Sequence, residues 1–168
     1  LLPAAPDDRA RARWLEEFAD TRLGDLCIWG LFYQRVVGPI VWGEPADEAR
    51  IETTLNEGLP AALDYLENEA PGGGFRFGGI GLADIAVASF FRNAAYAGFE
   101  IDAARWPKAA AWVARTLDHD CIDRFLKFER AQLSTSPQGR RRALLDAGAP
   151  LVDESVGGRE PRRGLMAL

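Results

Sequence analysis

The side chains most suited to metal binding lie around the single histidine of the chain. His119 stands between Asp118 and Asp120 and is followed by Cys121. Carboxylate, imidazole and thiolate groups all bind metal ions, but adjacent residues of a helix face different directions and cannot all reach one ion. Asp120 and Asp123 have instead the spacing of an N-cap and a third helical residue. We therefore interpret this stretch as the start of a helix and expect no metal site.

The sequence also lacks the patterns that supply nucleophilic catalysis or phosphate binding. With one histidine and no G-x-S-x-G motif, a serine-based triad is unsupported. No G-x-x-x-x-G-K-[ST] loop occurs, and a dinucleotide fingerprint that includes Gly79 and Gly81 would need a glycine at position 84, where the chain has aspartate. We therefore expect neither a serine-based triad nor a phosphate-binding loop in this chain.

One carboxylate has the position of a helix cap. Across residues 82–91 the only charged side chain is Asp84. If Gly81 is the N-cap of a helix, Asp84 is its third residue, where a carboxylate accepts hydrogen bonds from free N–H groups, and Ile80 and Ile85 form a hydrophobic staple. We favour this structural cap, made of Gly81 and Asp84, over a catalytic carboxylate. The ionised carboxylate is expected to accept from the N–H of Gly81 or of the loop before it.

Aromatic residues of the first predicted helix are the best candidates for a small-molecule site. Trp29 and Tyr33 are four residues apart and therefore share a helix face. They can belong to the core or to a subunit contact, or they can form the apolar wall of a pocket in which the Tyr33 hydroxyl is a polar handle. Arg22 and Asp25 lie within a few turns on the same helix. The candidate substrate-binding residues are therefore Arg22, Trp29 and Tyr33.

Composition indicates an acidic, single-domain globular protein. The chain has 168 residues, of which 48% are hydrophobic and 27% charged, enough to bury a substantial core. The net charge of −5 argues against nucleic-acid binding, which needs a basic surface. No apolar run is long enough to predict a membrane span. Cys27 and Cys121 form no paired framework, which indicates a reducing, cytoplasmic setting.

Two long helices are predicted in the first half of the chain. Apolar side chains with three- and four-residue spacing predict a long, bent helix that is capped by Asp7 or Asp8 and ends at Gly38 and Pro39. A second helix, over residues 46–68, has acidic residues opposite its leucine stripe. Pro60 lies inside this helix and predicts a kink, because it removes a backbone donor.

Three further helices are predicted over residues 82–97, 106–117 and 121–133. The first of them is apolar around most of its circumference, which is typical of a helix in the middle of a bundle. Two-residue alternation of polar and apolar side chains is nowhere sustained. The predicted fold class is therefore all-α, a helical bundle with a buried central helix.

The C-terminal residues differ from the rest in charge. Acidic residues outnumber basic ones up to Gln138, whereas basic residues outnumber acidic ones from Gly139 onward. A short helical stretch begins at Arg140 and is closed by Gly148 and Pro150. We therefore divide the chain into three parts and expect the end of the third to fold back over the second: a linker (1–6), a helical domain (7–137) and an extended tail (138–168).

Two motifs give the chain a resemblance to a known family. The first is the sequence G-L-A-D-I-A at residues 81–86, at the start of the central helix, and the second is W-P at residues 106–107, followed by Arg115. Together with the order of the helices, they resemble the C-terminal helical domain of glutathione transferases. The resemblance covers residues 6–128. The family usually has serine or threonine where this chain has Gly81.

The resemblance implies an activity that this chain shares with a second domain. In the family, a thioredoxin-like domain precedes the helical one, binds most of the glutathione and supplies the Ser, Tyr or Cys that stabilises its thiolate. The chain is expected to begin where that domain ends. The helical domain forms a wall of the pocket for a small apolar electrophile and contributes to a homodimer. The resemblance thus implies a cytoplasmic transferase with glutathione as co-substrate, in which this chain alone is inactive.

Two other functions are compatible with the same resemblance. Transferase-like helical domains also serve as non-catalytic protein-interaction modules, and the architecture also occurs in glutathione-dependent disulfide reductases. An upstream thioredoxin-like half with a cis-proline and a hydroxyl or thiol residue would favour an enzyme. Tests with different substrates would separate a transferase from a reductase.

Overall fold

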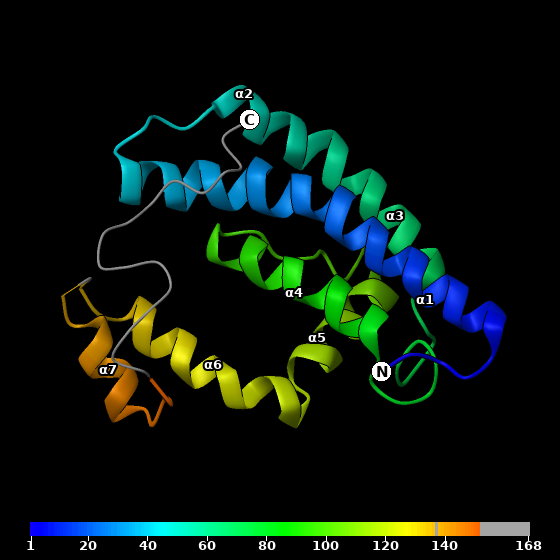
Figure 1. The fold of residues 1–168 in the computed structure, drawn as a ribbon. Helices are drawn as coiled ribbons and strands as arrows, with labels where there is room; N and C mark the ends of the chain where they lie inside the picture. Colours follow the sequence, from blue (N-terminus) through cyan, green and yellow to red (C-terminus); the bar gives the residue numbers. More distant parts are fainter. Residues whose placement is uncertain (137, 152–168) are drawn as a thin grey trace. The chain divides into compact units, whose positions relative to one another are not determined.

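The computed structural model describes residues 1–136 and 138–151, which fall into two compact units. The first unit covers Leu1–His119 and holds the helical segments from α1 to α5, and the second begins at Asp120 and holds α6 and α7 (Figure 1). The unit boundary comes before the predicted tail. The predicted folding back of the chain end falls outside the described residues.

The first helix of the structure begins earlier than predicted. Helix α1 (Pro6–Phe18) has Ala5 as its N-cap, and Asp7 and Asp8 lie in its first turn. The prediction that one of these aspartates is the cap is therefore wrong. Pro6 explains the difference, because proline has the φ angle of a first helical residue and lacks the N–H that a cap would satisfy. The two carboxylates still interact favourably with the helix dipole.

The same helix continues further than predicted. It runs on as a π-helical segment, η1 (Ala19–Trp42), so the predicted end at Gly38 and Pro39 is wrong. The wider π-helical turn offers room for the Pro39 ring, which in an α-helix clashes with the carbonyl four residues earlier. Glu44 donates its N–H to the Gly38 carbonyl at 3.0 Å. The helix ends only at Gly43, whose φ of 66° is left-handed.

The second predicted helix is a run of three segments. Helix α2 (Glu48–Thr53) is capped by Asp47, whose carboxylate accepts from the Arg50 N–H at 3.0 Å. A π-helical turn, η2 (Thr54–Gly58), follows and leads into α3 (Leu59–Glu69). Pro60 lies in the first turn of α3, so the predicted disturbance takes the form of the π-helical turn immediately before it.

Helix α4 (Leu82–Tyr96) is the buried central helix that the sequence predicts, and α5 (Pro107–Leu117) follows it. Helix α4 contacts α1, η1 and α5, and Figure 1 shows α4 beneath the long α1–η1 helix. Extended pairing in the described residues is confined to two isolated bridges within residues 75–79. The all-α fold class is therefore confirmed for the part of the chain that the structure describes.

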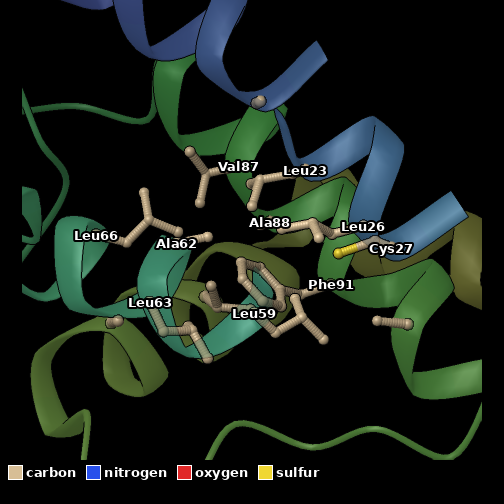
Figure 2. Close-up of a cluster of buried hydrophobic side chains, with 14 of the residues drawn as sticks. Leu23, Leu26, Cys27, Leu59, Ala62, Leu63, Leu66, Val87, Ala88 and Phe91 are labelled. Carbon is tan, nitrogen blue, oxygen red and sulfur yellow. The ribbon is translucent and has the colours of Figure 1, made fainter. Parts of the chain in front are cut away.

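The core of the first unit contains buried side chains of η1, α3 and α4 and also of α1, α2 and α5. Figure 2 shows the part of it in which side chains of η1, α3 and α4 meet. Each contributing residue is removed from water, which stabilises the fold by about 25 cal/mol per Å² of apolar surface. The labelled residues are Leu23, Leu26, Cys27, Leu59, Ala62, Leu63, Leu66, Val87, Ala88 and Phe91.

Helix η1 and turn η2 cross at very short range. A Cβ atom added at Gly30 would overlap the side chain of Thr54, and one added at Gly58 would overlap the side chain of Leu26. Both glycines and both partners are buried. The two backbones can therefore approach this closely because each presents a glycine at the crossing.

The second unit is a pair of amphipathic helices. Helix α6 (Asp120–Leu133) contacts α7 (Arg140–Asp146), and Arg142 forms an ion pair with Asp146 at 3.0 Å. None of the residues in either helix is fully buried. Among the described residues, no helix combines the length and the apolar character needed to cross a membrane.

Candidate functional site

An open groove lies between η1 and the run from α2 to α3. Its volume is about 670 Å³. Arg50 and Asp25 form an ion pair across it at 2.8 Å, and among the described residues Arg22 has no hydrogen bond or ion pair of its own. The charged lining suits polar or ionic groups better than a small apolar molecule. It is made of Arg22, Asp25, Leu26, Asp47, Ala49, Arg50, Thr53, Thr54, Glu57, Gly58 and Ala61.

The aromatic pair lies elsewhere on the same helix. The rings of Trp29 and Tyr33 are tilted against each other with centroids 5.6 Å apart, and both residues are half-buried. The Tyr33 hydroxyl donates a hydrogen bond to a Glu44 carboxylate oxygen at 2.8 Å. Gln34 holds the segment after Glu44, because its side-chain oxygen accepts from the Asp47 N–H at 3.0 Å.

The structure therefore places the three candidate substrate-binding residues in two locations. Trp29 and Tyr33 contact each other, whereas Arg22 lines the groove and neither aromatic ring does. Glu44 was not predicted as a partner of Tyr33, because the chain leaves the helix at Gly43 and returns beside it. Arg50 in the groove was missed for the same reason, although the Asp47–Arg50 cap spacing could have located the start of α2.

Asp84 lies at the start of α4 with its carboxylate surrounded by donors. It is 1% exposed. One oxygen accepts from the Gly81 N–H at 2.9 Å, and the other accepts from the Arg76 N–H at 2.9 Å and from the indole N–H of Trp112 at 2.6 Å. A carboxylate so enclosed is suited to holding segments together, not to moving protons to a substrate. Trp112 was not predicted as a partner, although a buried indole N–H needs an acceptor.

The acidic face of α3 has a structural role that the sequence analysis missed. The Glu67 carboxylate accepts from the backbone N–H groups of Lys108 and Ala109, at 3.1 and 2.8 Å, and so caps the start of α5. Asp64 accepts from the indole N–H of Trp106 at 2.7 Å. Periodicity predicted these carboxylates on the face opposite the leucine stripe, but it could not identify α5 as their partner.

A second network joins α1, α3 and the loop before α4. The Glu69 carboxylate accepts from the guanidinium groups of Arg11 and Arg76, with Arg11 Nε at 3.0 Å and Arg76 Nη2 at 3.4 Å. The hydrogen bond from Arg11 lowers the pKa of Glu69 most, burial opposes it, and Arg76 lowers it further. The same bond raises the pKa of Arg11. Tyr65 adds its hydroxyl oxygen, which accepts from Arg11 Nη2 and from Trp14 Nε1.

A comparison with models of known families identifies the first unit. Residues 10–115 match the family described as glutathione S-transferase, C-terminal domain. The chain belongs to this family. The match covers more than half of the chain and contains both motifs that carry the resemblance. Neither curated proteins nor solved structures gave a significant match.

Within this glutathione S-transferase C-terminal domain, the cysteine of the core is not suited to thiol chemistry. Cys27 is fully buried, and burial raises its pKa to about 12, so almost none of it is the reactive thiolate at neutral pH. The His119 ring packs edge-on against Phe75, with centroids 5.5 Å apart. The described residues contain no cluster of His, Cys, Asp and Glu that could hold a metal ion.

Proposed function

We propose that this chain is the electrophile-side half of a glutathione transferase-like protein. The family match over residues 10–115 is the observation that carries the proposal. In such a protein, a thioredoxin-like domain binds glutathione and lowers the pKa of its thiol, the electrostatic task on which conjugation or reduction depends. The helical domain then holds an apolar electrophile against the bound thiolate. The intact protein is proposed to be a cytoplasmic homodimer.

Trp29 and Tyr33 are the residues we propose for the wall of the electrophile pocket. Their half-buried rings combine an apolar surface with access, and such rings commonly line small-molecule sites. The bond from the Tyr33 hydroxyl to Glu44 supports this role, because it fixes the ring and keeps its polar end at the edge of the site. The known acceptor chemistry of the family leaves conjugation and disulfide reduction as alternatives, which differ in the substrate that is turned over.

The groove that Arg22 lines supports a second candidate function, a protein-interaction module. Ligand pockets for small molecules are mostly apolar, whereas this groove carries charges of both signs around an exposed arginine. Charged groups of this kind give protein contacts their specificity. In this role Arg22 would pair with an acidic side chain of a partner protein.

Calorimetry with glutathione tests the proposed division of labour. The 168-residue chain alone is expected to show no micromolar binding, because the domain that binds glutathione is a separate one. A protein in which the thioredoxin-like domain precedes this chain is expected to conjugate glutathione to an activated aryl halide. Micromolar binding by the chain alone would contradict the proposal. A two-domain protein without conjugation or disulfide reduction would favour the interaction module.

A further inference from the structure

The first N–H group of α4 donates to a residue that lies before α1 in the sequence. The backbone N–H of Leu82, the first residue of the helix, donates to the carbonyl of Leu1 at 2.9 Å. The first N–H groups of a helix have no partner within it, and an N-cap side chain usually accepts from one of them. Gly81 has no side chain to do so. The carbonyl of Leu1 therefore serves a free N–H group of the central helix.

The conformation of Gly81 does not itself require glycine. Its φ of −133° and ψ of −178° are extended backbone that any residue adopts. The requirement comes from the space around it, since a Cβ atom at position 81 would lie 2.9 Å from the oxygen of Leu1. The obstacle is a backbone atom, so it cannot be removed by rotating a side chain. The carbonyl of Leu1 can therefore lie at this position only because residue 81 is glycine.

The segment before α1 is built to reach this position. Helix α1 starts at Pro6 and contacts α4. The residues before α1 therefore lie near the start of α4. Pro3 and Pro6 each fix one backbone φ angle. A segment restricted in this way loses less conformational entropy when it docks.

We propose that residues 1–5, the N-terminal segment, form a clasp on the central helix. In this clasp the Leu1 carbonyl accepts from the first N–H of α4, and Gly81 leaves it room. When the N-terminal segment is docked, the Leu82 N–H has an acceptor. When the segment detaches, that N–H loses its acceptor and the first turn of α4 loosens. Because the Asp84 carboxylate in the same turn also holds Arg76 and Trp112, detachment weakens the junction of α4 with the preceding loop and with α5.

The test compares Gly81→Ser in two chains, the parent and a chain that begins at Pro3. In the parent, the serine Cβ displaces the Leu1 carbonyl, so the melting temperature is expected to fall by about 2–4 °C. In the shortened chain the space is free and the serine hydroxyl can accept from the free N–H groups, so the melting temperature is expected to rise by a similar amount. A change of sign between the two chains is the expected result.

Two controls separate the backbone of the N-terminal segment from its side chains. A chain with Leu1→Ala and Leu2→Ala keeps the carbonyl and is expected to respond to Gly81→Ser as the parent does. Hydrogen exchange of the Leu82 amide reports the bond directly. Its protection is expected to fall by about tenfold when residues 1 and 2 are removed, the equivalent of one lost hydrogen bond, and to stay unchanged in the alanine chain.

The proposal can also be tested without the shortened chain, should that chain not fold. In the parent, Gly81→Ser is expected to release the N-terminal segment, seen as a lower NMR order parameter at Leu2 with no change at Arg9 in α1. An ordered Leu2 in the serine variant would overturn the proposal. So would a Gly81→Ser effect of the same sign in both chains, or full protection of the Leu82 amide after residues 1 and 2 are removed.

Discussion

The carboxylate of Asp84 accepts from donors that belong to three segments: Gly81 at the start of α4, Arg76 in the preceding loop and Trp112 in α5. A single side chain can serve all three because its two oxygens offer about four lone-pair positions. Gly81, where the resemblance implies serine or threonine, leaves the neighbouring N–H to the carbonyl of Leu1. The start of the central helix is thus held by acceptors that are not consecutive in sequence.

Replacing Asp84 with alanine is expected to lower the free energy of unfolding by about 1–3 kcal/mol, because the buried donors lose their acceptor. Loss of the helix cap alone costs about 0.5–2 kcal/mol. Asp84→Asn is expected to recover part of the loss, since its carbonyl oxygen still accepts but carries no charge to interact with the helix dipole. Urea unfolding of both variants measures the effect. Values within about 0.5 kcal/mol of the parent for both would contradict a capping role.

At Tyr33 the expected effect is on substrate binding. In the two-domain protein, Tyr33→Ala is expected to raise the apparent KM for an apolar electrophile by about tenfold and that for glutathione much less, because only the electrophile contacts the ring. Tyr33→Phe keeps the ring and removes the bond to Glu44, so a small change is expected. If Tyr33→Ala changes the KM of both substrates equally, or of neither, the residue belongs to the core or to a subunit contact.

At the scale of elements, periodicity predicted the helices better than their partners. The stripe of leucines located the run from α2 to α3, and the lone charge in residues 82–91 identified the central helix. Spacing could not show the π-helical winding of η1, because a change of winding depends on packing and not on residue type alone. It also could not show that Glu67 caps α5, since that contact joins positions far apart in sequence.

The network at Glu69 gives the packing of α1 on α3 a pH dependence. The pKa of Glu69 is lower in the folded chain than in the unfolded chain. The stability that Glu69 contributes is therefore complete above its unfolded pKa of about 4.3, and it is lost as the pH falls through its folded pKa. Glu69→Gln is therefore expected to reduce the slope of unfolding free energy against pH below about pH 5. Urea titrations at a series of pH values measure this slope.

The control for this prediction is Glu52→Gln, which removes an exposed carboxylate in α2. It is expected to leave the pH profile of the parent unchanged, because the side chain of Glu52 takes part in no hydrogen bond or ion pair among the described residues. A Glu69→Gln profile that superimposes on those of the parent and the control would show that the Arg11–Glu69 contact contributes no pH-dependent stability.

At the scale of the whole molecule, every buried hydrophobic residue of the core within residues 1–136 and 138–151 lies between Ala12 and Val113. A fragment of residues 1–119 is therefore expected to fold and to unfold in one cooperative urea transition, since it keeps the complete core. A fragment of residues 1–97 is the matched contrast. It lacks α5 and the Trp112 bond to Asp84, so it is expected to lose the cooperative transition. Circular dichroism during urea unfolding distinguishes them, and a non-cooperative 1–119 fragment would contradict the prediction.

The crossing of η1 and η2 has a consequence for how the sequence can change over evolution. At Gly30 the obstacle is the β-branched side chain of Thr54, which is buried and has few rotamers, whereas at Gly58 it is the end of the flexible Leu26 side chain. A larger residue at position 58 can therefore be absorbed by a new Leu26 rotamer, but one at position 30 requires a smaller residue at position 54. Related sequences should thus show coordinated substitution at positions 30 and 54 and independent drift at position 58.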